Sequence, residues 1–156
     1  MDTLEIRDAQ LCYRGIIDTH NHLLFVPIPQ KEALLKPCKI VGKKTLRKGK
    51  VQLNLNDGRN IMVEKDTYST GDTLLLELPG QKIHDHFTLE KGAYVYLDGG
   101  KHTGRTGIVE KIDGNVLYFK PEGENTLIET KKAFAIVLGK GTSAITLDST
   151  PKTLKK

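Results

Sequence analysis

The chain has 156 residues, of which 38% are hydrophobic and 28% charged, which excludes an intrinsically disordered protein and fits one mid-sized domain or two small ones. No stretch approaches the roughly 18 apolar residues of a membrane-spanning helix, and no secretory signal is visible, so we expect a cytoplasmic protein without a membrane partner. The formal net charge of +5 favours a polyanionic partner.

Residues 1–36 predict short strands and a helix. Apolar runs with polar breaks indicate strands over residues 4–6, 11–17 and 23–26. The segment PQKEALLK, from Pro29, fits two helical turns, because proline is favoured at the first helical position and Pro37 would end the helix. We interpret residues 1–36 as the remnant of an upstream module followed by a connector helix.

Residues 37–86 predict a central antiparallel β domain. A strand begins at Cys38, a basic turn follows, and VQLNL alternates as a strand with one solvated face should. Asp57-Gly58 provides the positive backbone φ of a tight hairpin turn, so the next apolar segment returns as the partner strand. The expected strands span residues 38–41, 51–55, 60–63 and 73–78.

Residues 87–141 predict a small closed β-barrel. Short strands follow one another closely in this segment, and closing them into a barrel removes exposed sheet edges. The expected strands span residues 93–97, 108–112, 116–119, 126–130 and 133–138. From residue 142 onward the composition turns to Ser, Thr and Lys with no core to bury, so we expect residues 142–156 to be a flexible tail.

Seven basic residues and no acidic one lie between Lys36 and Lys50. Most charge runs are solvated faces, but this one also contains Gly42 and Gly49, which indicates a basic turn. Long side chains on a turn extend outward, where they can reach a phosphate backbone. The candidate phosphate-binding residues of this turn are Lys43, Lys44, Arg47, Lys48 and Lys50.

Two His-x-His pairs invite a metal-site interpretation. His20 and His22, in GIIDTHNHL, resemble the strand-end motif of metal-dependent amidohydrolases, because residues two apart share one face of a strand. That chemistry needs further ligands delivered by a barrel of roughly 250 residues, and this chain is too short. The second pair, His84 and His86, falls in an expected loop. We therefore expect no metal site and interpret residues 18–21 as a hairpin turn.

Residues 99–106, GGKHTGRT, nearly spell a P-loop, with Arg105 in place of the lysine. In a P-loop a helix begins directly after the glycines, whereas here a β-branched, strand-like segment follows. A planar guanidinium also replaces the compact ammonium that reaches the terminal phosphates. We expect no nucleotide hydrolysis. A loop whose backbone N–H groups approach nucleic-acid phosphates remains open as an alternative.

The sequence gives no support for catalysis or for a cofactor. Cys12 and Cys38 lie far apart, in no zinc-binding spacing, so we interpret both as buried or idle thiols. No Ser-His-Asp or Cys-His constellation can be read from the spacing. We predict a protein that is not an enzyme, holds no metal or cofactor and takes no small-molecule substrate.

Residues 89–111, LEKGAYVYLDGGKHTGRTGIVEK, resemble the KOW motif of ribosomal proteins and of transcription elongation factors. A charged turn is followed by alternating apolar residues, and GKHTGRTG then leads into a new strand. Gly104 and Gly107 permit a tight loop that allows close approach. The side chains that extend from this loop toward a phosphate backbone are those of Lys101, His102 and Arg105.

A wider resemblance covers roughly residues 10–141. KVQLNLNDGRNI, YSTGDTLLLELPGQKI, the KOW segment and FAIVLGK together resemble the family of small-subunit ribosomal protein four of the archaeal/eukaryotic type, closest in style to its archaeal members. The resemblance implies a central β domain and an SH3-like KOW barrel, both lying against small-subunit rRNA. Family members begin with a basic arm and a small RNA-binding domain that do not precede Met1, so we expect a truncated or partly numbered chain.

The resemblance implies a structural constituent of the small ribosomal subunit that binds rRNA through basic loops and contacts neighbouring ribosomal proteins. The alternative is a KOW-containing transcription elongation factor that touches RNA polymerase, which would need a hydrophobic docking surface instead of the basic turn. We expect Arg59 and Arg105 to make bidentate or stacking contacts that lysine cannot make. The RNA-binding candidates are Lys43, Lys44, Arg47, Lys48, Lys50, Arg59, Lys101, His102, Arg105 and Lys140.

Overall fold

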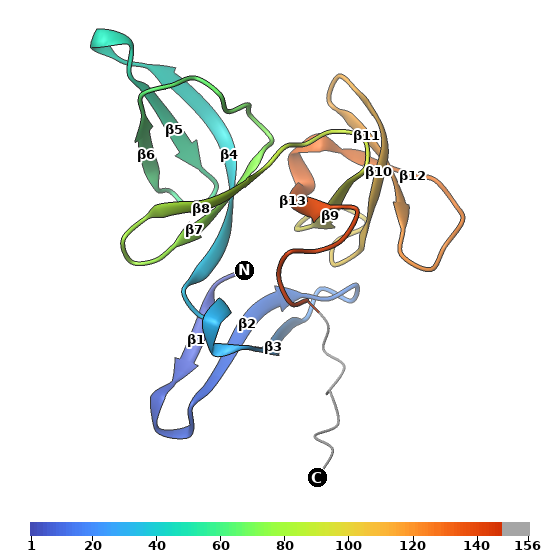
Figure 1. The fold of residues 1–156 in the computed structure, drawn as a ribbon. Helices are drawn as coiled ribbons and strands as arrows, with labels where there is room; N and C mark the ends of the chain where they lie inside the picture. Colours follow the sequence, from blue (N-terminus) through green and yellow to red (C-terminus); the bar gives the residue numbers. More distant parts are fainter. Residues whose placement is uncertain (148–156) are drawn as a thin grey trace.

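The computed structural model describes residues 1–147, which fold into three antiparallel sheets. In Figure 1 the N-terminal sheet lies at the bottom, the central sheet at the upper left and the C-terminal sheet at the upper right. Every helical segment in this range is a three-residue 3-10 turn, so the expected mainly β fold is confirmed. None of these turns has the length or apolar character needed to cross a membrane.

The N-terminal sheet has the order β1-β2-β3 and leaves one apolar face open. Its strands are β1 Thr3–Ile6, β2 Leu11–Ile17 and β3 Leu23–Ile28. Residues directly opposite each other share a face, so the pairing of Ile6 with Leu11 and of Ile17 with Leu23 builds an apolar stripe. The exposed side chains of this face are Leu4, Ile6, Leu11, Leu23 and Phe25.

The opposite face of the N-terminal sheet packs on the rest of the chain through a buried arginine. Arg14 is fully buried, and its Nη2 donates to the carbonyl oxygens of Glu32 (3.3 Å) and Leu35 (3.0 Å). The Glu32 carboxylate lies 3.8 Å from the same nitrogen. A buried charge needs such partners, so these contacts attach the N-terminal sheet to the start of the central sheet.

The central sheet has the order β6-β5-β4-β7-β8. The long strand β4 pairs with β7 through its first half and with β5 through its second half. In β5, Val51, Leu53 and Leu55 are buried while the two polar residues between them are partly exposed, as the alternation predicts. The strands are β4 Leu35–Thr45, β5 Val51–Leu55, β6 Asn60–Val63, β7 Thr73–Glu77 and β8 Lys82–Phe87.

The C-terminal sheet has the order β12-β11-β10-β9-β13, so its last strand returns beside its first. The sheet curls around a core that includes Val95, Val109, Phe119 and Val137, which are fully buried. The sheet is a curled half-barrel, which fits the SH3-like fold expected for a KOW domain. The expected full closure is wrong, because the edge strands β12 and β13 do not pair. The strands are β9 Ala93–Leu97, β10 Thr106–Asp113, β11 Val116–Pro121, β12 Ile128–Lys131 and β13 Ala135–Lys140.

The central sheet and the barrel share a third hydrophobic cluster. Leu75 of β7 packs there with Tyr96 of β9 and Ile136 of β13. The backbone N–H of Val137 also donates to the Thr73 hydroxyl (3.0 Å), and this hydrogen bond is buried. Because apolar burial and a buried hydrogen bond both cross the boundary, the two sheets are held in one arrangement.

The prediction of a two-turn helix from Pro29 is wrong. A single 3-10 turn, η2 Gln30–Glu32, is followed by β4, which already begins at Leu35. Leu35 pairs with Glu77, and Pro37 lies inside the strand opposite Leu75. The residue before a proline favours extended backbone, and pairing with β7 overrides the helical propensity of KEALL.

The loop expected around His84 and His86 is also wrong, because both residues lie in β8. Residues 142–147 of the expected tail are only partly exposed, because some of them pack against the rest of the chain. Ile145 is buried in the shared cluster, and the Thr146 N–H and hydroxyl each donate to the Glu32 carboxylate at 3.0 Å. Residues 148–156 of the expected tail lie outside the described residues.

Candidate nucleic-acid interface

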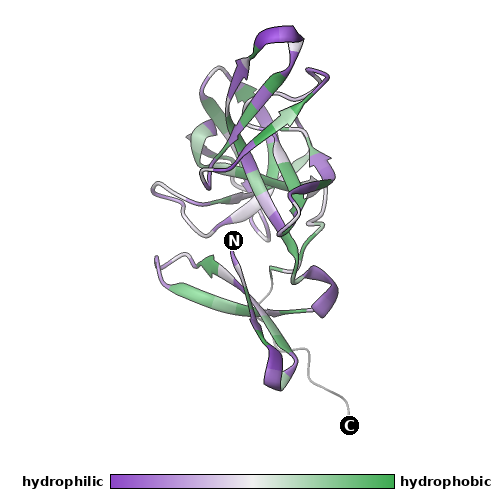
Figure 2. Ribbon diagram, turned by 90° about the vertical axis from the view of Figure 1, so that its left-hand side faces the viewer, coloured by the Kyte–Doolittle hydropathy of each residue, from purple (hydrophilic) through white to green (hydrophobic). Residues whose placement is uncertain are grey.

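The basic turn, residues 43–50, forms the tip of the β4–β5 hairpin. Its 3-10 turn η3, Arg47–Gly49, places Lys48 and Gly49 at positive φ angles of 65° and 74°. The tip stands at the top of the molecule in Figure 2, where the ribbon is strongly hydrophilic. Four exposed cations of this turn form no side-chain hydrogen bond or ion pair with any described residue: Lys44, Arg47, Lys48 and Lys50.

The other three cations of the Lys36–Lys50 run have partners inside the molecule. Lys36 forms ion pairs with Asp2 (2.5 Å) and Asp57 (3.3 Å). Lys43 pairs with Asp66 and donates to the Tyr68 carbonyl oxygen (2.6 Å). A stretch without acidic neighbours in the sequence is therefore partly neutralised by carboxylates from elsewhere in the chain.

Lys39 is a buried cation that joins the central sheet to the barrel. Its Nζ donates to the carbonyl oxygens of Lys132 (3.0 Å) and Ala133 (2.5 Å), and only 5% of the residue is exposed. Burial in a poorly solvating environment lowers the pKa of Lys39 to about 8. This lysine is a structural link and is not available to a phosphate.

The KOW loop, residues 98–105 between β9 and β10, is held by its own backbone. The N–H groups of Thr103, Gly104 and Arg105 donate to carbonyl oxygens within residues 97–102. The Phe134 ring lies so close that a Cβ on Gly100 would meet it at 2.8 Å. These N–H groups already donate within the loop, so they are not available to bind a phosphate. A strand rather than a helix follows the loop, so the geometry does not fit a P-loop.

The cations of the KOW loop fall into two groups. Lys101 is exposed and His102 partly exposed, and neither side chain contacts a described residue by a hydrogen bond or ion pair. Arg105 instead directs Nη1 at both carboxylate oxygens of Glu124, at 3.1 and 3.3 Å. Its guanidinium already has an acidic partner on the surface.

Two further candidates also carry acidic partners. Arg59 pairs with Asp57 across its own hairpin turn, and the Asp57 carboxylate also accepts the Arg59 N–H (3.1 Å). Lys140 pairs with Glu90 at 3.2 Å, although both side chains are largely exposed. Such exposed pairs are weak, so an RNA phosphate could replace the Lys140 partner more readily than the partner of Arg59.

The KOW loop rests against the turn between β2 and β3. Gly104 has a φ of +81°, and a Cβ placed on it would lie 2.3 Å from the Asp18 carbonyl carbon. The Tyr96 hydroxyl, on the strand before the loop, donates to the Ile17 carbonyl oxygen (2.8 Å) and accepts the Ile17 N–H (2.9 Å). The KOW loop and the β2–β3 turn therefore form one surface, far from the basic turn in Figure 1.

The β2–β3 turn is the expected hairpin turn, ordered by Asp18. The Asn21 N–H donates to the Asp18 carbonyl oxygen (3.1 Å), and Asn21 has a φ of 62°. The Asp18 carboxylate accepts the N–H groups of His20 and His22, both at 2.8 Å. These hydrogen bonds, with that from His22 strongest, lower the pKa of Asp18. Both imidazoles lie on the outside of the turn.

Neither His-x-His pair forms a metal centre. Within residues 1–147 no group of three or more His, Cys, Asp and Glu side chains is arranged to hold a metal ion. In β8 a register shift falls between the partners of Leu75 and Leu76, and the two histidines go to different surroundings. The His86 Nε2 pairs with buried Asp72 at 2.8 Å, while His84 lines an open groove.

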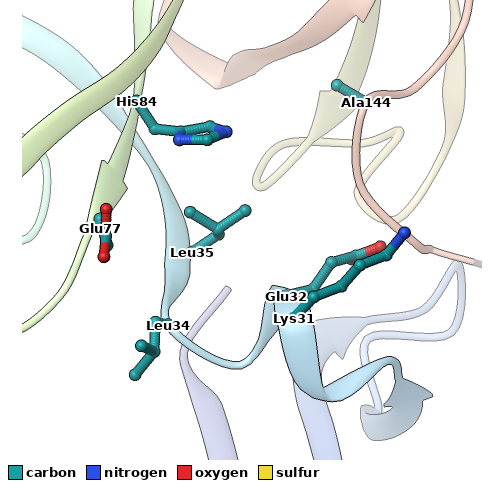
Figure 3. Close-up of a pocket in the computed structure, with 7 residues that line it drawn as sticks. All are labelled: Lys31, Glu32, Leu34, Leu35, Glu77, His84 and Ala144. Atoms are coloured by element: carbon teal, nitrogen blue, oxygen red, sulfur yellow. The ribbon is translucent and has the colours of Figure 1, made fainter.

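That groove does not have the features of an active site. Figure 3 shows His84 and Glu77 on one side of it, Lys31 and Glu32 on the other, and Leu34 and Leu35 between them. The charged groups do not converge, and no nucleophile stands beside a base. Cys12 and Cys38 are buried and form no disulfide, and burial raises the pKa of Cys38 to about 12, which leaves it unreactive.

Sequence reasoning did not identify two parts of this arrangement. The contact between Gly104 and Asp18 joins residues far apart in the chain, and the only local signal was the glycine itself. The buried role of Lys39 was hidden in a run of basic residues that all looked alike. Its single hint was the apolar sequence around it, Cys38 and Ile40, in a strand.

A sequence model described as "Ribosomal family S4e" matches residues 9–83. The small ribosomal subunit protein eS4 of Korarchaeum cryptofilum is 36% identical over 141 residues, which are 90% of this chain and 60% of that protein. The protein of the same name from Methanopyrus kandleri is 34% identical, over 94% of this chain and 64% of its own length. The chain thus spans less than two thirds of these relatives.

A solved structure has a similar fold. The crystal structure of the 30S ribosomal protein S4e from Thermoplasma acidophilum matches 84% of this chain and 68% of its own with a TM-score of 0.73. The sequence identity is 23%, so this likeness supports the fold alone.

Proposed function

This chain belongs to the ribosomal S4e family, and we propose that it is a structural, non-enzymatic constituent of the small ribosomal subunit that binds rRNA through basic surface loops. Its relatives are named as small-subunit ribosomal proteins, which supports the same place for this chain, in the cytoplasm on the ribosome. Small-subunit rRNA and neighbouring ribosomal proteins are its proposed partners.

One observation carries the RNA-binding proposal: four of the five cations of the basic turn, all except Lys43, lack acidic partners among the described residues. They are exposed at the tip of a hairpin, where long side chains can follow a sugar–phosphate backbone. Lysine and arginine that neutralise phosphates release counterions, which gives sequence-independent affinity. We propose that Lys101 and His102 of the KOW loop add a second contact, while Lys43, Arg59, Arg105 and Lys140 contribute by exchanging their acidic partners for phosphate.

The experiment measures binding of the full chain to a fluorescent small-subunit rRNA fragment over a series of salt concentrations. Replacing the four unpaired cations of the basic turn (Lys44, Arg47, Lys48 and Lys50) by Gln lowers the slope of log affinity against log salt by about 0.7 to 0.9 for each phosphate that is no longer neutralised. The matched control removes the same charge elsewhere on the surface, at Lys65, Lys82, Lys91 and Lys111. If both variants show the same reduction in affinity and slope, net charge rather than the basic turn drives binding.

The alternative of a polymerase-bound elongation factor has less support. The relatives carry ribosomal names, and the basic turn lacks the apolar core of a protein-docking surface. Co-sedimentation of the tagged chain with small subunits in a gradient supports the ribosomal function. Co-purification with RNA polymerase in the absence of ribosomal subunits contradicts it.

A further inference from the structure

The two histidines of the β2–β3 turn are aromatic and exposed, and their backbone N–H groups are held by Asp18. The His20 and His22 side chains are 79% and 74% exposed. Their rings are stacked, with centroids 6.1 Å apart and an interplanar angle of 19°. Each Nδ1 also faces the Asp18 carboxylate, at 3.7 and 3.6 Å. Among the described residues, these side chains are not part of a group of three arranged to hold a metal ion, so we consider another role for the motif.

The surroundings of this turn point to RNA. The KOW loop, which carries Lys101 and His102, touches the turn at Gly104. Cations for a phosphate and flat rings for a base thus come from adjoining backbone segments. Proteins recognise unpaired RNA by this combination, because every base offers a face to an aromatic ring while duplex bases are already stacked.

Resting on the proposed function, we propose that the β2–β3 turn is a stacking platform for unpaired rRNA bases, and that Lys101 and His102 hold the adjoining phosphates. The Asp18 side chain is a positioning residue, since its carboxylate accepts the backbone N–H groups of both histidines. The basic turn then supplies general attraction to RNA, and this second surface selects single-stranded segments.

The test uses two probes of the same mixed sequence: a 12-nucleotide single-stranded RNA containing 2-aminopurine, and its blunt duplex. In the full chain, His20→Ala combined with His22→Ala weakens binding of the single strand about tenfold, a reduction typical of one stacked base. It also removes the quenching of 2-aminopurine fluorescence and changes duplex affinity less than twofold. His20→Phe combined with His22→Phe restores single-strand affinity, because the aromatic faces return without a titratable group.

His84→Ala serves as the matched control, since this exposed histidine lies on β8, away from the KOW loop, and its removal leaves both affinities unchanged. Three results would overturn the inference: unchanged single-strand binding of the alanine variant, equal weakening for single strand and duplex, or no rescue by phenylalanine. The Gln variant of the basic turn, run beside these, separates the two proposals. If it binds RNA more weakly while the histidine variant does not, the platform is wrong and the proposed function stands.

Discussion

The basic turn and the KOW loop carry the same kind of charge in opposite ways. Gly49 of the basic turn has no atom within 4 Å of a Cβ built on it, and every cation of this turn except Lys43 lacks an acidic partner among the described residues. Gly104 of the KOW loop is in close contact with Asp18, and Arg105 is paired with Glu124. The basic turn is an open, charged tip, whereas the KOW loop is packed against another part of the chain.

Two cationic loops of similar composition therefore differ in the side-chain substitutions that they tolerate. An open tip attracts phosphate by charge alone, so its side chains are interchangeable as long as the charge remains. A packed loop positions its groups through specific contacts, so small changes of shape matter there. Three pairs of matched variants test this difference between buried and open positions.

Gly104→Ala should cost about 3 kcal/mol of folding stability, because the new Cβ overlaps backbone and the residue has a left-handed φ. The matched change Gly49→Ala meets no neighbour and should cost only about 1 kcal/mol, from its left-handed φ. Denaturant unfolding of both variants measures the free energies of unfolding. Equal destabilisation would show that the KOW loop moves away from Asp18 without penalty, which would remove the contrast.

Lys39 offers a comparison within one strand, since it lies on β4 with Lys44 but points inward. Burial lowers the pKa of Lys39 to about 8, so folding disfavours its charged form. Between pH 8 and its ordinary value of 10.5 the unfolded chain binds more protons than the folded one. The contribution of Lys39 to the free energy of unfolding should therefore rise with pH across this window, on the order of 2 kcal/mol. Above about pH 9 the raised pKa of Cys38 contributes in the opposite direction, so the Lys39 contribution is read as the difference between wild type and a Lys39 variant.

Lys39→Met should abolish this pH-dependent gain, whereas Lys44→Met should keep it. Thermal or denaturant unfolding from pH 7.5 to 10.5 gives both curves. If the two variants follow the wild-type curve equally, Lys39 is solvated and does not link the sheets.

Arg105→Lys should weaken RNA binding about threefold and reduce incorporation into small subunits, because a lysine ammonium cannot donate to two oxygens of a phosphate with the bidentate geometry of a guanidinium. Arg47→Lys on the open tip should leave affinity unchanged, since a point charge suffices there. Filter binding and co-sedimentation measure both. Equal behaviour of the two variants would mean that the KOW loop also acts through charge alone.

Local patterns predicted most strands and turns of this fold. The Asp-Gly turn before Arg59 and the alternating strand from Val51 are both present, because each depends on neighbours in sequence. The helix from Pro29 failed because pairing of Leu35 with Glu77 was not visible locally. Strand β8 was missed because KIHDHF has polar residues on most positions and resembles a loop.

The sequence predicted the positively charged residues of the candidate site but not the carboxylates that pair with them. Each cation could be read from the sequence, but the carboxylates of Asp66, Glu90 and Glu124 reach their partners only through the fold. The same holds for the contact of Asp18 with the KOW loop. Electrostatic compensation depends on distance in space, and sequence spacing carries little of it.

Strand β4 connects the basic turn to the N-terminal sheet and to the C-terminal sheet. Its first residues meet the N-terminal sheet near Arg14, Lys39 fastens its middle to the barrel, and its last residues carry the basic turn. The two proposed RNA-binding surfaces are thus connected through β4, which sets how far apart they lie. An RNA that binds both surfaces at once must therefore present phosphates and unpaired bases at that separation.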